Sequence, residues 1–187
     1  MKFTHYIFAL GIFLATFSVA QAAAINTGVS CSLVNAVISA ETNTATGGCT
    51  AGSGPSDVIY VTQNETISYP YNFTDNSFPV ITSTITIKGS GSGQLITFDN
   101  LSSNPLRMFE VYGGKLTLEG LSFDGTFTTG PLIDKGLIIY AHDNSTINLF
   151  RVNTLGTYVV NDGGVVYAED SNINIRGSEF HESSAMN

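Results

Sequence analysis

Short runs in which apolar and polar residues alternate fill most of the chain after residue 57. In Ile81 to Phe98, for example, Ile81, Ile85 and Ile87 alternate with threonine, lysine and serine. Alternation of this kind predicts a β-strand with one buried and one exposed face. Turns with glycine or asparagine separate the runs, and no helical period occurs beyond Val80. The pattern therefore predicts an all-β region of short strands.

The alternating runs also repeat along the chain. GGVVYAEDSNINIRGSEF at Gly163 to Phe180 resembles GLIIYAHDNSTINLFRV at Gly136 to Val152 and MFEVYGGKLTLEGLSF at Met108 to Phe123. Self-similarity at a fixed period is typical of repeat proteins. Aligning the copies gives steps of 31, 31 and 26 residues between four apolar positions, namely Ile87, Leu118, Leu149 and Ile175. This spacing predicts a parallel β-helix, in which like strands stack about 4.8 Å apart.

Each residue type has an expected place in such a coil. The pairs Gly113-Gly114 and Gly163-Gly164 are expected at corners where the chain needs positive φ. Ile173, Ile175 and Phe180 of the last copy are expected to point into the core.

Three asparagines allow two interpretations. Asn148, Asn172 and Asn174 could form a ladder at stacked turns. Asn148 and Asn174 alternate with apolar residues, however, so they could equally occupy outward, solvated positions.

The first 22 residues are predicted to be a signal peptide. Lys2 precedes the apolar run Tyr6 to Ala20, and Ala20-Gln21-Ala22 has the small-x-small pattern of a cleavage site. A membrane anchor is the alternative, but a run of about 15 residues is short for a span of about 20. We therefore expect an exported mature chain without a transmembrane segment.

Residues 23–57 are predicted to form an N-terminal cap, and residues 58–187 the coils. Leu33 to Ala40 has its apolar residues on one helical face, with Ser32 as N-cap. In an oxidising compartment, Cys31 and Cys49 are expected to form a disulfide, since a metal site needs further Cys or His nearby. Farther on, the aromatics of Tyr71 to Pro79 are expected to pack locally.

Composition narrows the range of partners. Apolar residues make up 43% and charged residues 12% of the chain, and the formal net charge is −8. Seven Lys and Arg residues provide no cationic stripe for nucleic acid or for anionic lipid. Polyanionic substrates are also disfavoured unless a divalent cation screens the approach.

The ordered motifs resemble the CSLREA-domain proteins of bacteria. CSLVNAV at Cys31 to Val37 is similar to that family's CSLREAI, and GGCTAG and DVIYV follow in the family's order. Phe78 to Gly91 is similar to its LPxITxxxTIxGxG pattern, and Arg107 to Gly125 to its RxFxVxxGxxLTLxGLTxxxG pattern. Val34-Asn35 departs from the family's Arg-Glu.

This resemblance implies an exported, secreted or cell-surface protein with a right-handed, single-stranded parallel β-helix. Members are often adhesin-like stalks with a separate anchor, and the family implies no reaction. A weaker likeness, through FxxN at Phe150 to Asn153, is to polymorphic outer-membrane autotransporter passengers.

The sequence offers little for catalysis. Strings typical of β-helix pectate lyases or pectin hydrolases do not occur, so no catalytic residue and no cofactor is expected. Stacked turns could bring Asp143 of one coil near Glu169 and Asp170 of the next as a weak Ca²⁺ site. Alternatively, these residues are present because acidic and small polar side chains are common in turns between strands. His142 is expected to be a solvated loop histidine.

The chain stops at HESSAMN, in the middle of a repeat. We expect a fragment of a longer protein, or an open last coil that pairs with a partner. The leading hypothesis is a non-catalytic exported β-helix module, a surface stalk or adhesin-like scaffold that binds glycans. The alternatives are a fragment of a polysaccharide lyase or hydrolase whose catalytic coils are missing, and a self-associating structural element.

Overall fold

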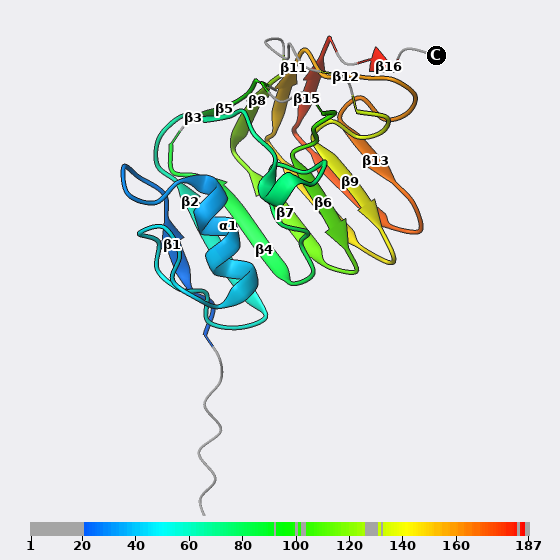
Figure 1. The fold of residues 1–187 in the computed structure, drawn as a ribbon. Coiled ribbons are helices and arrows are strands. Elements are labelled where there is room, and N and C mark those ends of the chain that lie inside the picture. Colours follow the sequence, from blue (N-terminus) through cyan, green and yellow to red (C-terminus); the bar gives the residue numbers. More distant parts are fainter. Residues whose placement is uncertain are drawn as a thin grey trace, which may run out of the picture.

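The computed structural model describes residues 21–91, 93–99, 101, 104–125, 131, 133–182 and 184–185. They form a parallel β-solenoid of about five turns with one short α-helix near its N-terminal end (Figure 1). The predicted all-β parallel β-helix with an N-terminal helix is confirmed. Of the predicted signal peptide, all but Gln21 and Ala22 lies outside the described residues.

Four parallel sheets make up the solenoid. The six-stranded sheet contains, in spatial order, β1 (Ala24–Asn26), β2 (Ser56–Val61), β4 (Thr84–Gly89), β7 (Lys115–Glu119), β10 (Thr146–Phe150) and β14 (Asn172–Arg176). The five-stranded sheet contains β3 (Glu65–Ile67), β5 (Gln94–Phe98), β8 (Leu121–Asp124), β11 (Asn153–Leu155) and β15 (Glu179–His181). The smaller sheets contain β6 (Phe109–Tyr112), β9 (Ile139–His142) and β13 (Val166–Ala168), and β12 (Tyr158–Val159) and β16 (Ser184–Ala185).

The register of the six-stranded sheet agrees with the sequence alignment. Leu118 pairs with Ile87 on one side and with Leu149 on the other, and Leu149 pairs with Ile175. The four positions aligned from sequence are therefore neighbours in one row across the sheet. The last repeat is shorter, at 26 residues, but β14 still pairs with β10 in the same register. The difference in length therefore lies outside these two strands.

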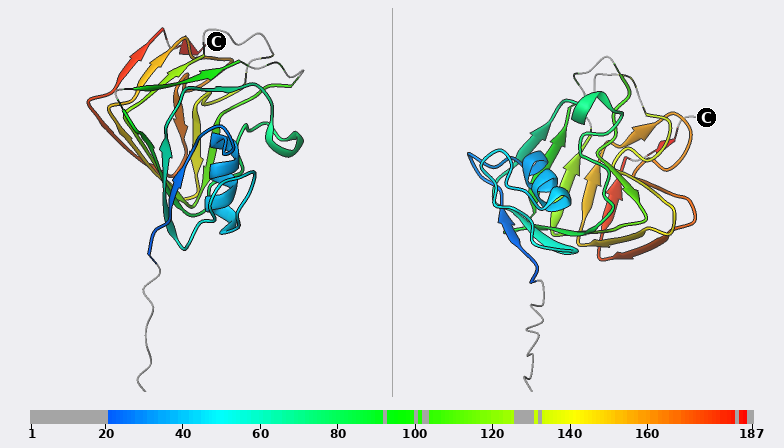
Figure 2. Two further views of the ribbon diagram at one scale, coloured as in Figure 1. Left: turned by 90° about the vertical axis from the view of Figure 1, so that its left-hand side faces the viewer. Right: turned by 60° about the horizontal axis from the view of Figure 1, so that its bottom comes forward.

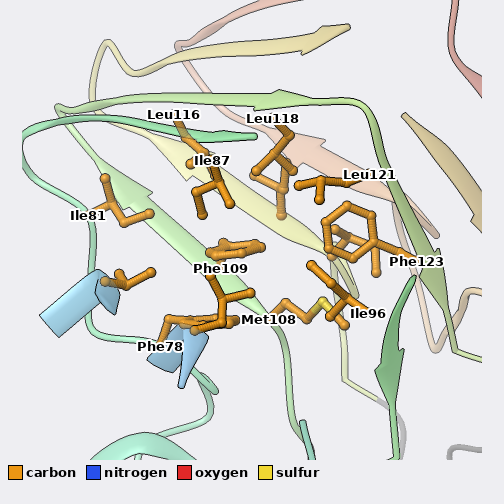
Figure 3. Close-up of a cluster of buried hydrophobic side chains, with 14 of the residues drawn as sticks. Phe78, Ile81, Ile87, Ile96, Met108, Phe109, Leu116, Leu118, Leu121 and Phe123 are labelled. Carbon is orange, nitrogen blue, oxygen red and sulfur yellow. The ribbon is translucent and has the colours of Figure 1, made fainter. Parts of the chain in front are cut away.

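Apolar side chains fill the interior of the stack. Figure 3 shows residues of several coils packed around Phe109, whose ring stacks on that of Phe78 with centroids 4.4 Å apart. Phe78 is fully buried. The expectation that the aromatics of residues 71–79 pack locally is thus wrong for Phe78. Local sequence could not show this, because its partner lies one coil farther along the chain. The same excursion begins with a short 3-10 helix, η1 (Tyr71–Phe73).

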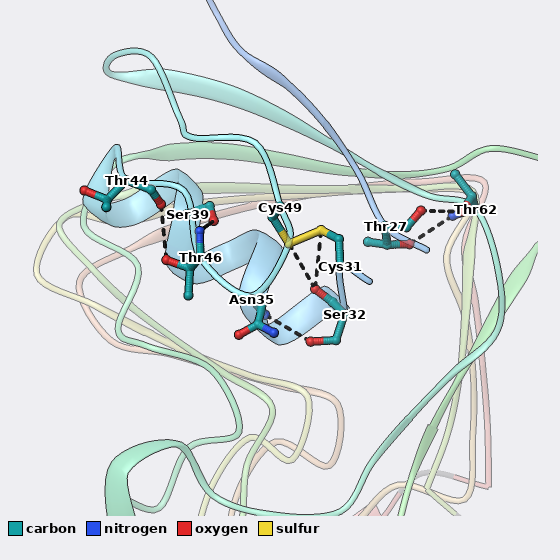
Figure 4. Close-up of a disulfide and its surroundings, with 9 residues drawn as sticks. All are labelled: Thr27, Cys31, Ser32, Asn35, Ser39, Thr44, Thr46, Cys49 and Thr62. Carbon is teal, nitrogen blue, oxygen red and sulfur yellow. Dashed lines mark hydrogen bonds between the residues drawn. A yellow bond between two sulfur atoms is a disulfide. The ribbon is translucent and has the colours of Figure 1, made fainter. Parts of the chain in front are cut away.

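The N-terminal cap is tied down by a helix and a disulfide. Helix α1 (Leu33–Thr42) begins after Ser32, whose hydroxyl accepts a hydrogen bond from the Asn35 backbone at 3.3 Å. Cys31 and Cys49 form the predicted disulfide, with Cα atoms 4.8 Å apart (Figure 4). Helix α1 packs against β1 and β2, so it covers the first strands of the stack (Figure 2).

Glu41 joins this cap to the next coil. Its carboxylate accepts hydrogen bonds from the backbone and hydroxyl groups of both Thr82 and Ser83, at 2.8 to 3.3 Å. Since Glu41 is on α1 and Ser83 immediately precedes β4, these bonds hold the helix against the solenoid.

Glycines at the corners serve two purposes. Gly113 and Gly163 have φ of 62° and 64°, as predicted, but Gly114 and Gly164 do not have positive φ. A Cβ on Gly114 would lie 2.8 Å from the carbonyl oxygens of Ile81 and Ser83, so this position requires glycine for close approach of the backbone.

For Asn148 and Asn174, each of the two interpretations is only partly correct. The Asn148 side chain donates to the Thr117 hydroxyl at 3.1 Å and accepts from the Asn174 amide at 3.0 Å. A ladder therefore exists, but it crosses the outer face of the six-stranded sheet, not a turn. Asn148 is buried, not solvated, because its neighbours in β7 and β14 cover it.

The last coil differs from the expectation that its apolar residues are core. Ile173, Ile175 and Phe180 are 40%, 51% and 38% exposed. Their alternation is as predicted, but in the described structure a coil covers them on one side only. No helix in the described part of the chain is long and apolar enough to cross a membrane.

Candidate functional site

Polar and aromatic side chains gather on the outer face of the three-stranded sheet. Strands β6, β9 and β13 lie side by side in Figure 1. In β6 and β9, alternation buries one set of side chains and turns the other outward. We call the outward set of four rings the aromatic face: Tyr112, Tyr140, His142 and Tyr167.

The four rings form one continuous surface. Tyr140 stacks on His142, with centroids 4.6 Å apart, and Tyr112 meets the edge of His142 at 5.0 Å. Tyr167 extends the surface beside Tyr140, at 5.7 Å. The register explains two of these contacts, because Tyr140 is the cross-strand neighbour of Tyr167 and His142 that of Tyr112. Tyr140 and His142 meet because they are two residues apart in β9 and so lie on the same face of the sheet. Tyr112 is 50% exposed, so the β6 end of the face is open to solvent.

Two cations lie over this face. The Arg107 guanidinium is 4.7 Å from the centre of the Tyr140 ring, and the Lys135 ammonium is 4.3 Å from that of Tyr167. Arg107 is also held by its own hydrogen bonds to the Lys135 carbonyl oxygen at 3.0 and 3.2 Å. The pKa of Arg107 is lowered by burial, but a guanidinium stays protonated in proteins.

Carboxylates balance these cations. Glu169 accepts hydrogen bonds from the hydroxyls of Tyr140 and Tyr167, both at 2.8 Å, and pairs with Lys135 at 3.4 Å. Glu110 accepts from the Asn76 amide at 2.7 Å and lies 3.9 Å from Arg107. Each cation above the rings is therefore paired with a carboxylate at the edge of the face.

His142 is part of this network, and the expectation of a solvated loop histidine is wrong. It ends β9, and its side chain is only 19% exposed. Its two ring nitrogens contact Glu110 at 3.0 Å and Asp143 at 2.6 Å. Burial alone lowers the pKa of His142, but the two carboxylates outweigh it and raise the pKa above its ordinary value. The imidazole is thereby stabilised in its charged form.

Three other groups of the face, Tyr140, Glu169 and Lys135, also have shifted pKa values. Burial, and then the hydrogen bond to Glu169, raise the pKa of Tyr140 above its usual 10. Hydrogen bonds from Tyr167 and Tyr140 lower the pKa of Glu169, and the bond to Tyr167 is the main cause of the raised pKa of Lys135. At neutral pH Tyr140 therefore keeps its proton and Lys135 its charge. This arrangement suits hydrogen bonding to a ligand better than proton abstraction.

Two of the three candidate calcium ligands, Asp143 and Glu169, are engaged by other side chains. The turns do stack, since the Asn144 backbone donates to the Asp170 carbonyl oxygen at 2.9 Å. The Asp143 carboxylate, however, contacts His142, and that of Glu169 contacts tyrosines and lysine. Among the described residues, no group of three or more His, Cys, Asp or Glu side chains could hold a metal ion.

Apart from the aromatic face, a polar depression of about 530 Å³ lies at the corner between the two larger sheets. Glu119 on its wall pairs with Lys88 at 2.9 Å and with Arg151 at 2.7 Å. Four glycines and two small polar residues complete the lining, namely Gly89, Gly91, Gly93, Gly120, Ser122 and Asn153. Because no aromatic ring lines it, this groove offers charge and backbone but no stacking surface.

Sequence reasoning did not identify the tyrosines. A usable indication was present, because IYAHD at Ile139 to Asp143 and VYAED at Val166 to Asp170 carry tyrosine at the same place in two repeats. Tyrosine repeated at an outward position of successive coils predicts a row of rings. No comparable repeat in the sequence predicts that Arg107 and Lys135 lie at this face, because each reaches it from a connection that precedes a strand.

No protein-family model, curated protein or solved structure matches this chain.

Proposed function

We propose that the protein is an exported, non-catalytic β-helix module of the CSLREA type whose aromatic face binds glycans. The observation that carries this proposal is the continuous row formed by Tyr112, His142, Tyr140 and Tyr167. Aromatic rings pack against the apolar faces of sugar rings, while fixed polar groups orient the hydroxyls. The disulfide and the apolar N-terminal run support export to a secreted or cell-surface location.

The charges of the face favour neutral glycans over uronides. Arg107 faces Glu110, Lys135 pairs with Glu169, and His142 contacts two carboxylates. A uronide carboxylate would have to displace one of these internal partners. A neutral sugar, in contrast, can use the same groups as hydrogen-bond donors and acceptors without separating an ion pair.

The repeat of the solenoid supports an extended ligand. Rings on neighbouring strands follow the strand spacing of about 4.8 Å. A linear glycan lying across the strands can therefore place successive sugars on successive coils. The ligand is expected to span β6, β9 and β13.

Affinity electrophoresis in gels containing soluble neutral polysaccharides tests the proposal. Wild-type protein should be retarded, and Tyr140→Ala should weaken binding about tenfold, because it removes the central ring. The matched control is Tyr60→Ala, which removes an exposed tyrosine from β2, in the six-stranded sheet.

Three results count against the proposal. These are no retardation by any neutral polysaccharide, equal weakening by Tyr60→Ala, and cleavage of a uronide polymer with release of unsaturated ends. The last result would instead support the alternative that the chain is part of a polysaccharide lyase.

The last coil supports a second candidate function, self-association with another copy of this chain. The exposed Ile173 and Ile175 belong to β14 and the exposed Phe180 to β15, and among the described strands these two are at the ends of their sheets. Open edges with apolar residues favour pairing between copies. Sedimentation should then show a dimer that Ile175→Lys converts to monomer. A wild-type monomer at high concentration contradicts this function.

A further inference from the structure

The backbone nitrogen of Ala23 contacts a buried carboxylate. It donates to Oδ1 of Asp57 at 2.8 Å, and the same oxygen accepts from the Ser53 backbone at 3.2 Å. Asp57 is 2% exposed. In the described part of the chain Asp57 has no ion-pair partner, so neutral amide groups alone balance its charge. Carboxylates buried this deeply are usually paired.

Ala23 also follows the predicted cleavage site directly. Gln21 and Ala22 are exposed, whereas Ala23 is half-buried and β1 starts at the next residue. The Ala23 carbonyl oxygen accepts a hydrogen bond from the Val58 backbone at 2.9 Å. The position of Ala23 next to Asp57 is thus set by the solenoid itself, while the two residues before it lie at the surface.

We propose that removal of the signal peptide after Ala22 creates an ion pair between the new α-ammonium group of Ala23 and the buried Asp57. A signal peptidase of the exporting cell hydrolyses the Ala22–Ala23 peptide bond with one water molecule. The carbonyl carbon of Ala22 gains the oxygen and becomes a carboxylate. The nitrogen of Ala23 gains the two protons of that water and becomes an ammonium, which is the main form below a pKa of about 8. The inference depends on the proposed export and not on glycan binding.

The ion pair explains why Asp57 is buried at this place. Cleavage replaces a neutral amide donor with a cationic one, which adds the attraction between opposite charges to the hydrogen bond that Asp57 already accepts. Asp57 also holds the loop before β2 through Ser53, so the ion pair joins the mature N-terminus, this loop and the first coil. Processing would therefore complete the cap, and the chain would become more stable once it is exported.

Thermal unfolding of two purified chains tests the ion pair. One starts at Ala23, and the other keeps Gln21 and Ala22 before it. We expect the chain that starts at Ala23 to melt about 4 °C higher. The Gln21 carbonyl oxygen contacts the Ser53 hydroxyl, so the extension adds a contact of its own. Asp57→Asn in both chains separates the effects, and it should abolish the difference that is due to charge.

Acylation of the α-amine provides a second measurement, which stays informative if Asp57→Asn fails to fold. An ammonium paired with Asp57 should react about tenfold more slowly with an amine-selective reagent than the exposed amine of the extended chain. Equal reaction rates, or a melting difference that persists in Asp57→Asn, overturn the ion pair. N-terminal sequencing of the exported protein should start at Ala23, and any other start overturns the processing step. Glycan binding is unaffected by each of these outcomes.

Discussion

The two ends of the solenoid contain equivalent residues but differ in what covers them. At the N-terminal end, α1 packs against β1 and β2, and Ile25 and Ile59 are fully buried. In the last coil, Ile173 and Ile175 of β14 are about half exposed. Both ends show the same alternation of apolar and polar residues. Within the part of the chain that the structure describes, only the first has a helix, a disulfide and the hydrogen bonds of Glu41 to complete it.

The difference shows that burial in this fold is not a property of a single repeat. Ile87 and Ile175 occupy the same row across the six-stranded sheet, yet Ile87 is 0% and Ile175 51% exposed. In a solenoid each coil is stabilised by its immediate neighbours. An apolar side chain therefore contributes its full burial energy only where coils or a cap cover it on both sides.

The largest expected effect comes from truncating these two isoleucines. Ile87→Ala should lower the free energy of unfolding by about 2–5 kcal/mol, because it leaves a cavity in a filled interior. Ile175→Ala should cost about 1 kcal/mol or less, since solvent already reaches this side chain. Urea unfolding monitored by circular dichroism measures both. Equal losses in the two variants would contradict the comparison of the ends.

Removing the disulfide should open the covered end. The double variant Cys31→Ala with Cys49→Ala releases a link between residues 18 apart in sequence, which is worth about 3 kcal/mol in the chain-entropy model. Hydrogen exchange should then show loss of protection in α1, with smaller changes in β10. The wild-type protein in reducing buffer is the control. Unchanged protection of α1 would mean that packing alone holds the cap.

The link between cap and coil should be weaker but measurable. Glu41→Ala removes the carboxylate that binds Thr82 and Ser83, and we expect a loss of about 1–2 kcal/mol. Thr44→Ala is the matched control, because its exposed hydroxyl bonds only to the nearby Thr42 carbonyl oxygen. Thermal melting distinguishes them, and the prediction is wrong if the two variants melt together.

The smallest expected difference concerns the asparagine ladder. Asn148 has a partner on both sides, whereas Asn174 of the last coil is exposed and bonds to Asn148 alone. Asn148→Ala should therefore cost about 1 kcal/mol, and Asn174→Ala about 0.5 kcal/mol or less. Chemical denaturation of both variants gives the comparison. A greater loss for Asn174→Ala would show that the last coil depends more on its polar contacts than on its core.

Much of the fold could be predicted from local features. The helix at residues 33–42, the disulfide and the row from Ile87 to Ile175 all follow from patterns that act over a few residues or from a constant repeat. The site could not be found in this way. His142 was expected to be solvated because it precedes the turn residues Asp143 and Asn144, and its contacts with Glu110 and Tyr112 lie one coil away.

By itself, the sequence determined that this chain forms stacked parallel strands with a cap, because alternation, corner glycines and the repeat length constrain each coil directly. Only the tertiary structure decided which polar residues meet. Stacking places Tyr140 beside Tyr167, brings Glu169 to the Tyr140 hydroxyl and sets Ala23 against Asp57. These contacts join residues about 30 positions apart. They depend on which coil lies next to which, and no single repeat specifies that.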